Sequence, residues 1–115
     1  MSQPTTAPHF VEAASGDGPT PFPGITTRPL FVGEGKGAHA CELAFKAGAL
    51  FPDHGHPAGE YLLMLEGRLQ VGDRCLGPGD FLYTPPGAWH RATAVTDCRC
   101  FLLVPSPVTF TPGGW

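Results

Sequence analysis

The chain has 115 residues, about the length of one domain, and its seven basic and ten acidic residues give a net charge of −3. So few charges exclude a basic face for nucleic acid, and the longest apolar run, Tyr61 to Leu65, is too short to cross a membrane. The amino terminus lacks the basic start and apolar stretch of a signal peptide, so we expect a cytoplasmic protein with reduced cysteines at Cys41, Cys75, Cys98 and Cys100.

Residues 1–24 combine frequent proline with threonine, glycine and alanine and have no sustained period. This composition predicts an extended arm that packs against the rest of the chain or against a partner chain. Residues 25–115 differ, because short apolar segments there alternate with turn residues, and we expect them to form one β domain. The expected strands are Thr27–Val32, His39–Phe45, Glu60–Leu65, Leu69–Val71, Arg74–Leu76, Asp80–Tyr83, Trp89–Val95 and Arg99–Val104.

No window of the sequence has a convincing helical period, so the predicted fold class is all-β, a sandwich or a barrel. Gly72-Asp73 suits a two-residue hairpin turn, and Pro85-Pro86-Gly87 predicts a second sharp change of direction. Cys98 and Cys100 would share one face of a strand, where two small core residues are favoured over a metal-binding pair.

Histidines and a carboxylate gather in the segment from His54 to Glu60. On extended backbone, residues at every second position point to the same side, so we expect His54, His56 and Glu60 to converge on one face. A carboxylate that faces a core is costly unless it is paired or bound to a cation, and imidazole with carboxylate is a ligand set for divalent first-row metals.

His90 follows a Pro-Gly corner and is the natural fourth donor from a neighbouring strand. A His-x-His pair without a further histidine or carboxylate nearby is more often a surface pair, or a hydrogen-bonded pair that binds no metal. His9 and His39 have no partner in the sequence, and we expect both to be ordinary surface residues. By the same alternation, Asp53 and Arg91 are expected to point outward, away from the site.

Together, the two histidine clusters resemble the motifs of the cupin superfamily. The first motif runs from Gly48 through His54, His56 and Glu60 to Gly67, and the second from Gly79 through Pro85 and Gly87 to His90, with every spacing kept. The second motif usually closes with asparagine, and here that position is Ala94. Because this asparagine is not a metal ligand in the family, the departure affects only a local hydrogen bond.

The resemblance implies a double-stranded β-helix, or jelly-roll, barrel that holds one divalent metal through His54, His56, Glu60 and His90. The short segment between the motifs is most similar to the cupin domains of zinc-dependent anti-sigma factors and to small aryl-ketone and diketone dioxygenases. Such anti-sigma factors carry a separate amino-terminal zinc domain, and residues 1–24, with one histidine and no cysteine, do not correspond to it. Cupins commonly dimerise, so a homodimer is also implied.

Three neutral imidazoles and one carboxylate around a divalent ion leave one uncompensated positive charge, which would attract an oxygen-donor ligand. The metal can be Zn, Fe, Mn, Ni or Cu, and its identity decides between oxygen chemistry and a Lewis-acid or sensing role. We therefore carry two leading hypotheses: a metal-dependent oxygenase acting on a small phenolic, ketone or diketone, and a non-catalytic sensor of metal or small molecules. A third interpretation is a purely structural barrel with a vestigial site. Among possible proton donors, parity favours Tyr83 over Tyr61, which is expected on the outer face.

Overall fold

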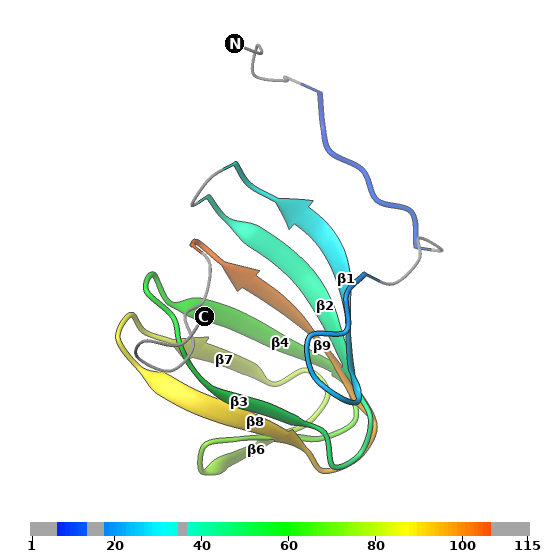
Figure 1. Ribbon diagram of the computed structural model, residues 1–115, viewed down its shortest axis with the longest axis vertical. Coiled ribbons are helices and arrows are strands. Elements are labelled where there is room, and N and C mark those ends of the chain that lie inside the picture. Colours follow the sequence, from blue (N-terminus) through cyan, green and yellow to red (C-terminus); the bar gives the residue numbers. More distant parts are fainter. Residues whose placement is uncertain (1–6, 14–17, 35–36, 107–115) are drawn as a thin grey trace.

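A computed structural model describes residues 7–13, 18–34 and 37–106, and these residues form two antiparallel β-sheets that face each other (Figure 1). The nine strands are β1 (Ile25–Val32), β2 (His39–Phe45), β3 (Leu50–Gly55), β4 (Glu60–Glu66), β5 (Leu69–Val71), β6 (Arg74–Leu76), β7 (Phe81–Thr84), β8 (Trp89–Ala94) and β9 (Cys98–Val104). Within the described ranges no helix is long and apolar enough to span a membrane.

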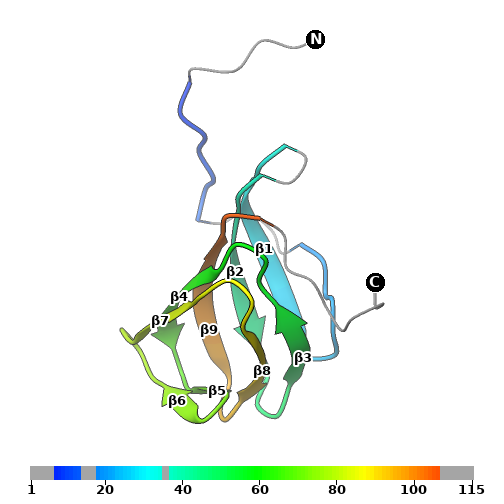
Figure 2. The same cartoon turned by 90° about the vertical axis from the view of Figure 1, so that its left-hand side faces the viewer.

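The larger sheet has the strand order β1-β2-β9-β4-β7, and the smaller has the order β3-β8-β5-β6. Strands that are distant in sequence lie side by side, and β9 pairs with both β2 and β4. Figure 2 shows the strands of both sheets arranged around a common interior. The all-β barrel expected from the sequence is confirmed.

Alternation of side chains along the strands builds the core between the sheets. On β4, Leu62 and Met64 are buried, whereas Tyr61 and Leu63 point outward. Successive residues of a strand point to opposite faces, so one face of each strand supplies the interior. The buried apolar side chains of the described residues are Ile25, Leu43, Phe45, Leu62, Met64, Leu69, Val71, Leu76, Ala92, Ala94, Cys98, Cys100 and Val104.

Eight of the nine strands coincide with expected strands to within two residues at each end. The one strand without a counterpart among the expected strands is β3 (Leu50–Gly55), although it carries His54. β3 is an edge strand of the smaller sheet, and it contains Pro52, which lacks the N–H group that a central strand would need. The strand was not predicted from the sequence because it is short and contains a proline.

The expected turns are present. Val71 pairs with Arg74 across the Gly72-Asp73 hairpin, and Gly87 adopts a φ of 88° in the Pro85-Pro86-Gly87 corner.

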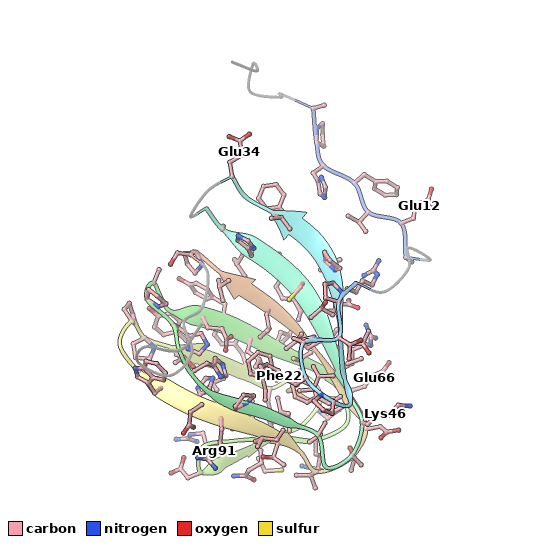
Figure 3. The ribbon with its side chains drawn as sticks, in the orientation of Figure 1. Glu12, Phe22, Glu34, Lys46, Glu66 and Arg91 are labelled. Carbon is pink, nitrogen blue, oxygen red and sulfur yellow. The ribbon has the colours of Figure 1, made fainter. Side chains whose placement is uncertain are left out.

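Part of the amino-terminal arm packs against the barrel. The ring of Phe22, labelled in Figure 3, packs edge-on against the ring of Phe51, with the ring centroids 4.9 Å apart.

Candidate metal centre

Three histidine side chains meet at one end of the barrel interior. His54 lies near the end of β3 and His90 near the start of β8, and these two residues are direct partners in the pairing of the two strands. His56 follows β3 in the next turn. One ring nitrogen from each of the three histidines lies within 4.8 Å of the others, and the ring centroids are 4.6 to 4.7 Å apart. The three residues predicted as imidazole ligands are therefore brought together.

The carboxylate of Glu60 faces this triangle from the first position of β4. Its Oε2 lies 3.0 Å from Nε2 of His56, and its Oε1 lies 3.8 Å from Nε2 of His90. Glu60 is only 3% exposed, and among the described residues its ion-pair partners are these two histidines, with no lysine or arginine. A buried carboxylate is costly unless a cation compensates its charge.

The route by which these residues converge differs from the one expected. Extended backbone from His54 to Glu60 was predicted to place them on one face, and that prediction is wrong. The chain leaves β3 after Gly55, reverses in a turn closed by a hydrogen bond from Gly59 N to His56 O, and enters β4 in the other sheet. His54 and Glu60 thus face each other across the interior.

Gly59 makes this reversal possible. It adopts a φ of 86°, in the left-handed region that favours glycine. A Cβ atom there would also lie 3.0 Å from the carbonyl oxygen of Thr84 and 3.2 Å from the hydroxyl of Tyr83. The turn that delivers His56 and Glu60 to the site therefore has no room for a side chain at position 59.

The ring of His54 is oriented by its own strand. Its Nδ1 lies 2.7 Å from the carbonyl oxygen of Pro52, to which it donates a hydrogen bond in the neutral tautomer, so that Nε2 carries the lone pair. Burial lowers the pKa of His54 to about 4 and also lowers the pKa of His90. Both imidazoles are therefore neutral near pH 7, which is the form that binds a metal ion.

His56 gives the strongest indication of a missing partner. It is 1% exposed, and neither of its ring nitrogens makes a hydrogen bond within the described part of the chain. The 3.0 Å contact with Glu60 is close but is not aligned as a hydrogen bond. Buried polar atoms are nearly always satisfied, so these residues fit a bound cation. Three imidazoles and one carboxylate are donors that a divalent transition metal accepts.

An apolar cavity of about 270 Å³ adjoins the cluster. His54, Glu60 and His90 line one part of it, and most of the remaining wall is aliphatic or aromatic. Pockets that hold small molecules usually have volumes of roughly 300–1,000 Å³ and a mainly apolar lining. The cavity is just below this range, so it suits a ligand of small size beside the cluster.

Behind the cluster, Asp53 and Arg91 point away from the interior, as expected. Figure 3 shows Arg91 on the outer side of β8. Its guanidinium makes two hydrogen bonds, of 3.0 and 3.2 Å, to the carboxylate of Asp53. This ion pair links β3 to β8 directly behind the paired His54 and His90, so it braces the strands that carry two of the imidazoles.

The cysteines are all free thiols. Cys98 and Cys100 are buried on the same face of β9, and burial raises the pKa of both, that of Cys98 to about 11. Neither belongs to the group of described residues whose ligand atoms lie within 4.8 Å of one another, which consists of His54, His56 and His90. The pair therefore serves as two small core residues.

Two predicted orientations are wrong. Tyr83 was expected to face the cavity, but Glu60 is paired with Thr84, and Tyr83 is paired with Tyr61 on the outer face of the sheet. Tyr83 is 45% exposed and does not line the cavity. His39 was expected on the surface with His9, yet it lines the cavity and its Nε2 is buried. The alternation of His39 with Cys41, Leu43 and Phe45 along β2 was the signal that could have found it.

The family is shown by a match over most of the chain. The model of the ChrR cupin-like domain matches residues 14–107. The chain belongs to the ChrR cupin-like family. It thereby joins the cupin superfamily that its two motifs indicated. No curated protein is similar enough to match the chain.

Solved structures of cupins share this fold. The anti-sigma factor ChrR of Rhodobacter sphaeroides, in complex with SigE, is 28% identical with a TM-score of 0.67. That match covers 75% of this chain and 46% of ChrR, so the chain spans less than half the length of ChrR. An acetylacetone dioxygenase from Acinetobacter johnsonii has a TM-score of 0.85 at 18% identity, with 97% of this chain and 83% of that chain covered. A putative acetylacetone dioxygenase from Methylibium petroleiphilum gives 0.86 at 19% identity, with 97% and 86% covered.

Proposed function

We propose that this ChrR-like cupin is a small metal-dependent oxygenase that binds one divalent transition metal through His54, His56, His90 and Glu60. The observation that carries the proposal is the meeting of three imidazoles and a buried carboxylate at the wall of an apolar cavity. The proposed substrate is a small phenol, ketone or diketone, because such a molecule combines oxygen donors with an apolar body. The structural similarity to an acetylacetone dioxygenase supports the same substrate class.

Each part of the site has a role in this proposal. The three histidines and Glu60 would hold the metal, which would supply Lewis acidity to a bound oxygen donor. Glu60 is the one anionic donor, so the loaded site keeps a positive charge that attracts an enolised or deprotonated oxygen. The apolar lining excludes water from the substrate and strengthens these electrostatic interactions. We place the activity in the cytoplasm, where free thiols such as the four cysteines persist.

Dioxygen consumption tests the proposed activity. Freshly purified protein is first analysed for its metal content, then loaded with iron, manganese, nickel or copper and mixed with a panel of small phenols, ketones and diketones. We expect about one metal ion per chain and substrate-dependent loss of dioxygen. Protein stripped of metal by a chelator is the control and should consume none. An oxygenase is ruled out if no metal-loaded form consumes dioxygen with any of these compounds.

A sensor is the second candidate, favoured by the match to the family of ChrR, which was solved as an anti-sigma factor in complex with SigE. In that case, the same cavity binds a metal or a small molecule without turnover, and a partner protein responds to its occupancy. Ligand binding with no dioxygen consumption, together with a partner that co-purifies only in one state of occupancy, would replace the oxygenase proposal with this one.

We also propose that the chain forms a homodimer through the outer face of the larger sheet. Tyr61, Leu63, Phe81 and Tyr83 are exposed there on neighbouring strands, and the rings of Tyr61 and Tyr83 are 5.1 Å apart. Contiguous exposed apolar side chains of this kind are typical of an interface.

Light scattering during gel filtration tests the dimer. The wild-type chain is expected to elute with the mass of two chains, and Phe81→Glu with the mass of one, because a charge would be buried in the interface. Val95→Glu is the matched control, since Val95 is also exposed but lies outside this face, and it should remain dimeric. A monomeric wild-type chain contradicts the proposal.

A further inference from the structure

His39 is a polar residue of the cavity that the proposed metal site does not use. It opens β2, and it lines the cavity with the next residues on the same face of the strand, Cys41, Leu43 and Phe45. Its Nε2 is buried and makes no hydrogen bond within the described residues. A buried ring nitrogen without a partner has lost its hydrogen bonds to water and gained none in return. This lowers the stability of the fold unless a bound molecule supplies the partner.

The rest of the cavity wall has few polar side chains that could form a hydrogen bond with a ligand. Thr27 also lines the cavity, but its hydroxyl donates a hydrogen bond of 2.7 Å to the carbonyl oxygen of Pro19. Cys41 and Cys100 present thiols, which are weak hydrogen-bonding groups. The lining residues other than these and the metal-site residues are apolar, apart from backbone atoms. His39 therefore stands out as a strong polar group away from the histidine cluster.

The sheet places His39 and Glu60 at the same level, with one strand between them. His39 is paired with Val104 of β9, and Tyr61 is paired with Leu103, so Val104 is level with Glu60. Neighbouring strands lie about 4.7–4.9 Å apart, which puts the backbones at His39 and Glu60 about 9–10 Å from each other. A small aromatic or alicyclic molecule is long enough to extend from one to the other.

We propose that His39 is the second polar anchor of the cavity and selects ligands that carry an oxygen group at each end of a small apolar body. One oxygen group faces the cluster of His54, His56, His90 and Glu60, and the other forms a hydrogen bond with Nε2 of His39. The first of these contacts rests on the proposed function. The contact with His39 adds a selectivity that the metal site alone would not give.

Paired probe ligands test this selectivity. The full chain is loaded with zinc, and its affinities for benzoate and for 4-hydroxybenzoate are measured by calorimetry. The two acids share the carboxylate and the ring, and they differ in the hydroxyl at the far end. We expect 4-hydroxybenzoate to bind about 2- to 10-fold more tightly, as one added hydrogen bond provides.

Variants then assign the preference to His39. His39→Leu is expected to remove the preference for 4-hydroxybenzoate over benzoate. His39→Gln keeps a hydrogen-bonding group and should retain part of the preference. Thr27→Val is the matched control, because it alters a polar residue of the same cavity whose hydroxyl is already engaged, and its preference should equal that of the wild type. Thermal melts establish that each variant is folded.

The possible failures are distinct. Equal binding of the two acids by the wild type, or a preference that survives in His39→Leu, overturns the role of His39 and leaves the metal site standing. A wild-type chain that takes up no zinc overturns the proposed function, and with it the ligand arrangement inferred here. A zinc-loaded chain that binds neither acid contradicts the proposed arrangement at both ends of the ligand.

Discussion

Glu60→Gln is expected to lower the affinity for a divalent metal by at least about a hundredfold. Loss of an outer hydrogen-bonding partner of a metal ligand already costs about 10- to 100-fold in affinity, and Glu60 is in the position of a direct donor that carries the one negative charge. Glutamine has nearly the same shape, so the change removes the charge and leaves the volume. Titration of the chelator-treated protein with zinc in a competition assay measures the effect.

Glu66→Gln is the control for this substitution. Glu66 lies at the other end of β4 with its side chain 68% exposed, where it pairs with Arg99 on the surface. Its replacement should leave the metal affinity unchanged. Because Glu60→Gln removes a buried charge, the metal-free variant should melt at the same temperature as the metal-free wild type or above it. If Glu60→Gln binds zinc as tightly as the wild type, Glu60 is not a ligand.

Removal of the metal is expected to lower the melting temperature by about 10–20 °C. A ligand present at about a hundred times its dissociation constant stabilises the folded state by about 2.7 kcal/mol, and each kcal/mol shifts the midpoint of a domain of 60–100 residues by about 4–8 °C. Differential scanning calorimetry of the zinc-loaded chain, with and without chelator, measures this difference.

Glu60→Gln again supplies the matched comparison. At the same zinc concentration the variant should be nearly unloaded, so the chelator should change its melting temperature little. Equal effects of the chelator on the variant and on the wild type would mean that the stabilising metal is bound somewhere else. An unchanged melting temperature of the wild type would contradict a metal that binds the folded state alone.

Most of the fold could be predicted from the sequence because its signals are local. Alternating apolar residues identify strands such as β2 and β4, and Gly72-Asp73 identifies a hairpin. β3 could not be predicted in this way. Its Pro52 is tolerated because the strand lies at the edge of its sheet, and position within a sheet is a property of the folded chain.

The residues that the two motifs selected lie together in the structure, but the chain reaches this arrangement by another path than the one predicted. The spacing of the two motifs selected the four residues that the structure brings together, whereas the assumption of one extended face failed because the chain reverses between His56 and Gly59. The orientation of Tyr83 depends on the register of β7 against β4. Registers between strands are set by tertiary packing, so parity along one segment cannot give them.

The placement of the candidate metal ligands on both sheets has a consequence for how fast the protein is degraded in a cell. His54 and His90 belong to the smaller sheet and Glu60 to the larger one, so an ion held by all three fastens one layer to the other. Without the bound ion the two sheets should separate more often by transient unfolding, and proteases cut such transiently unfolded chains. If the chain binds such an ion, its abundance in the cell should fall when the ion is scarce, because the copies without metal are degraded faster.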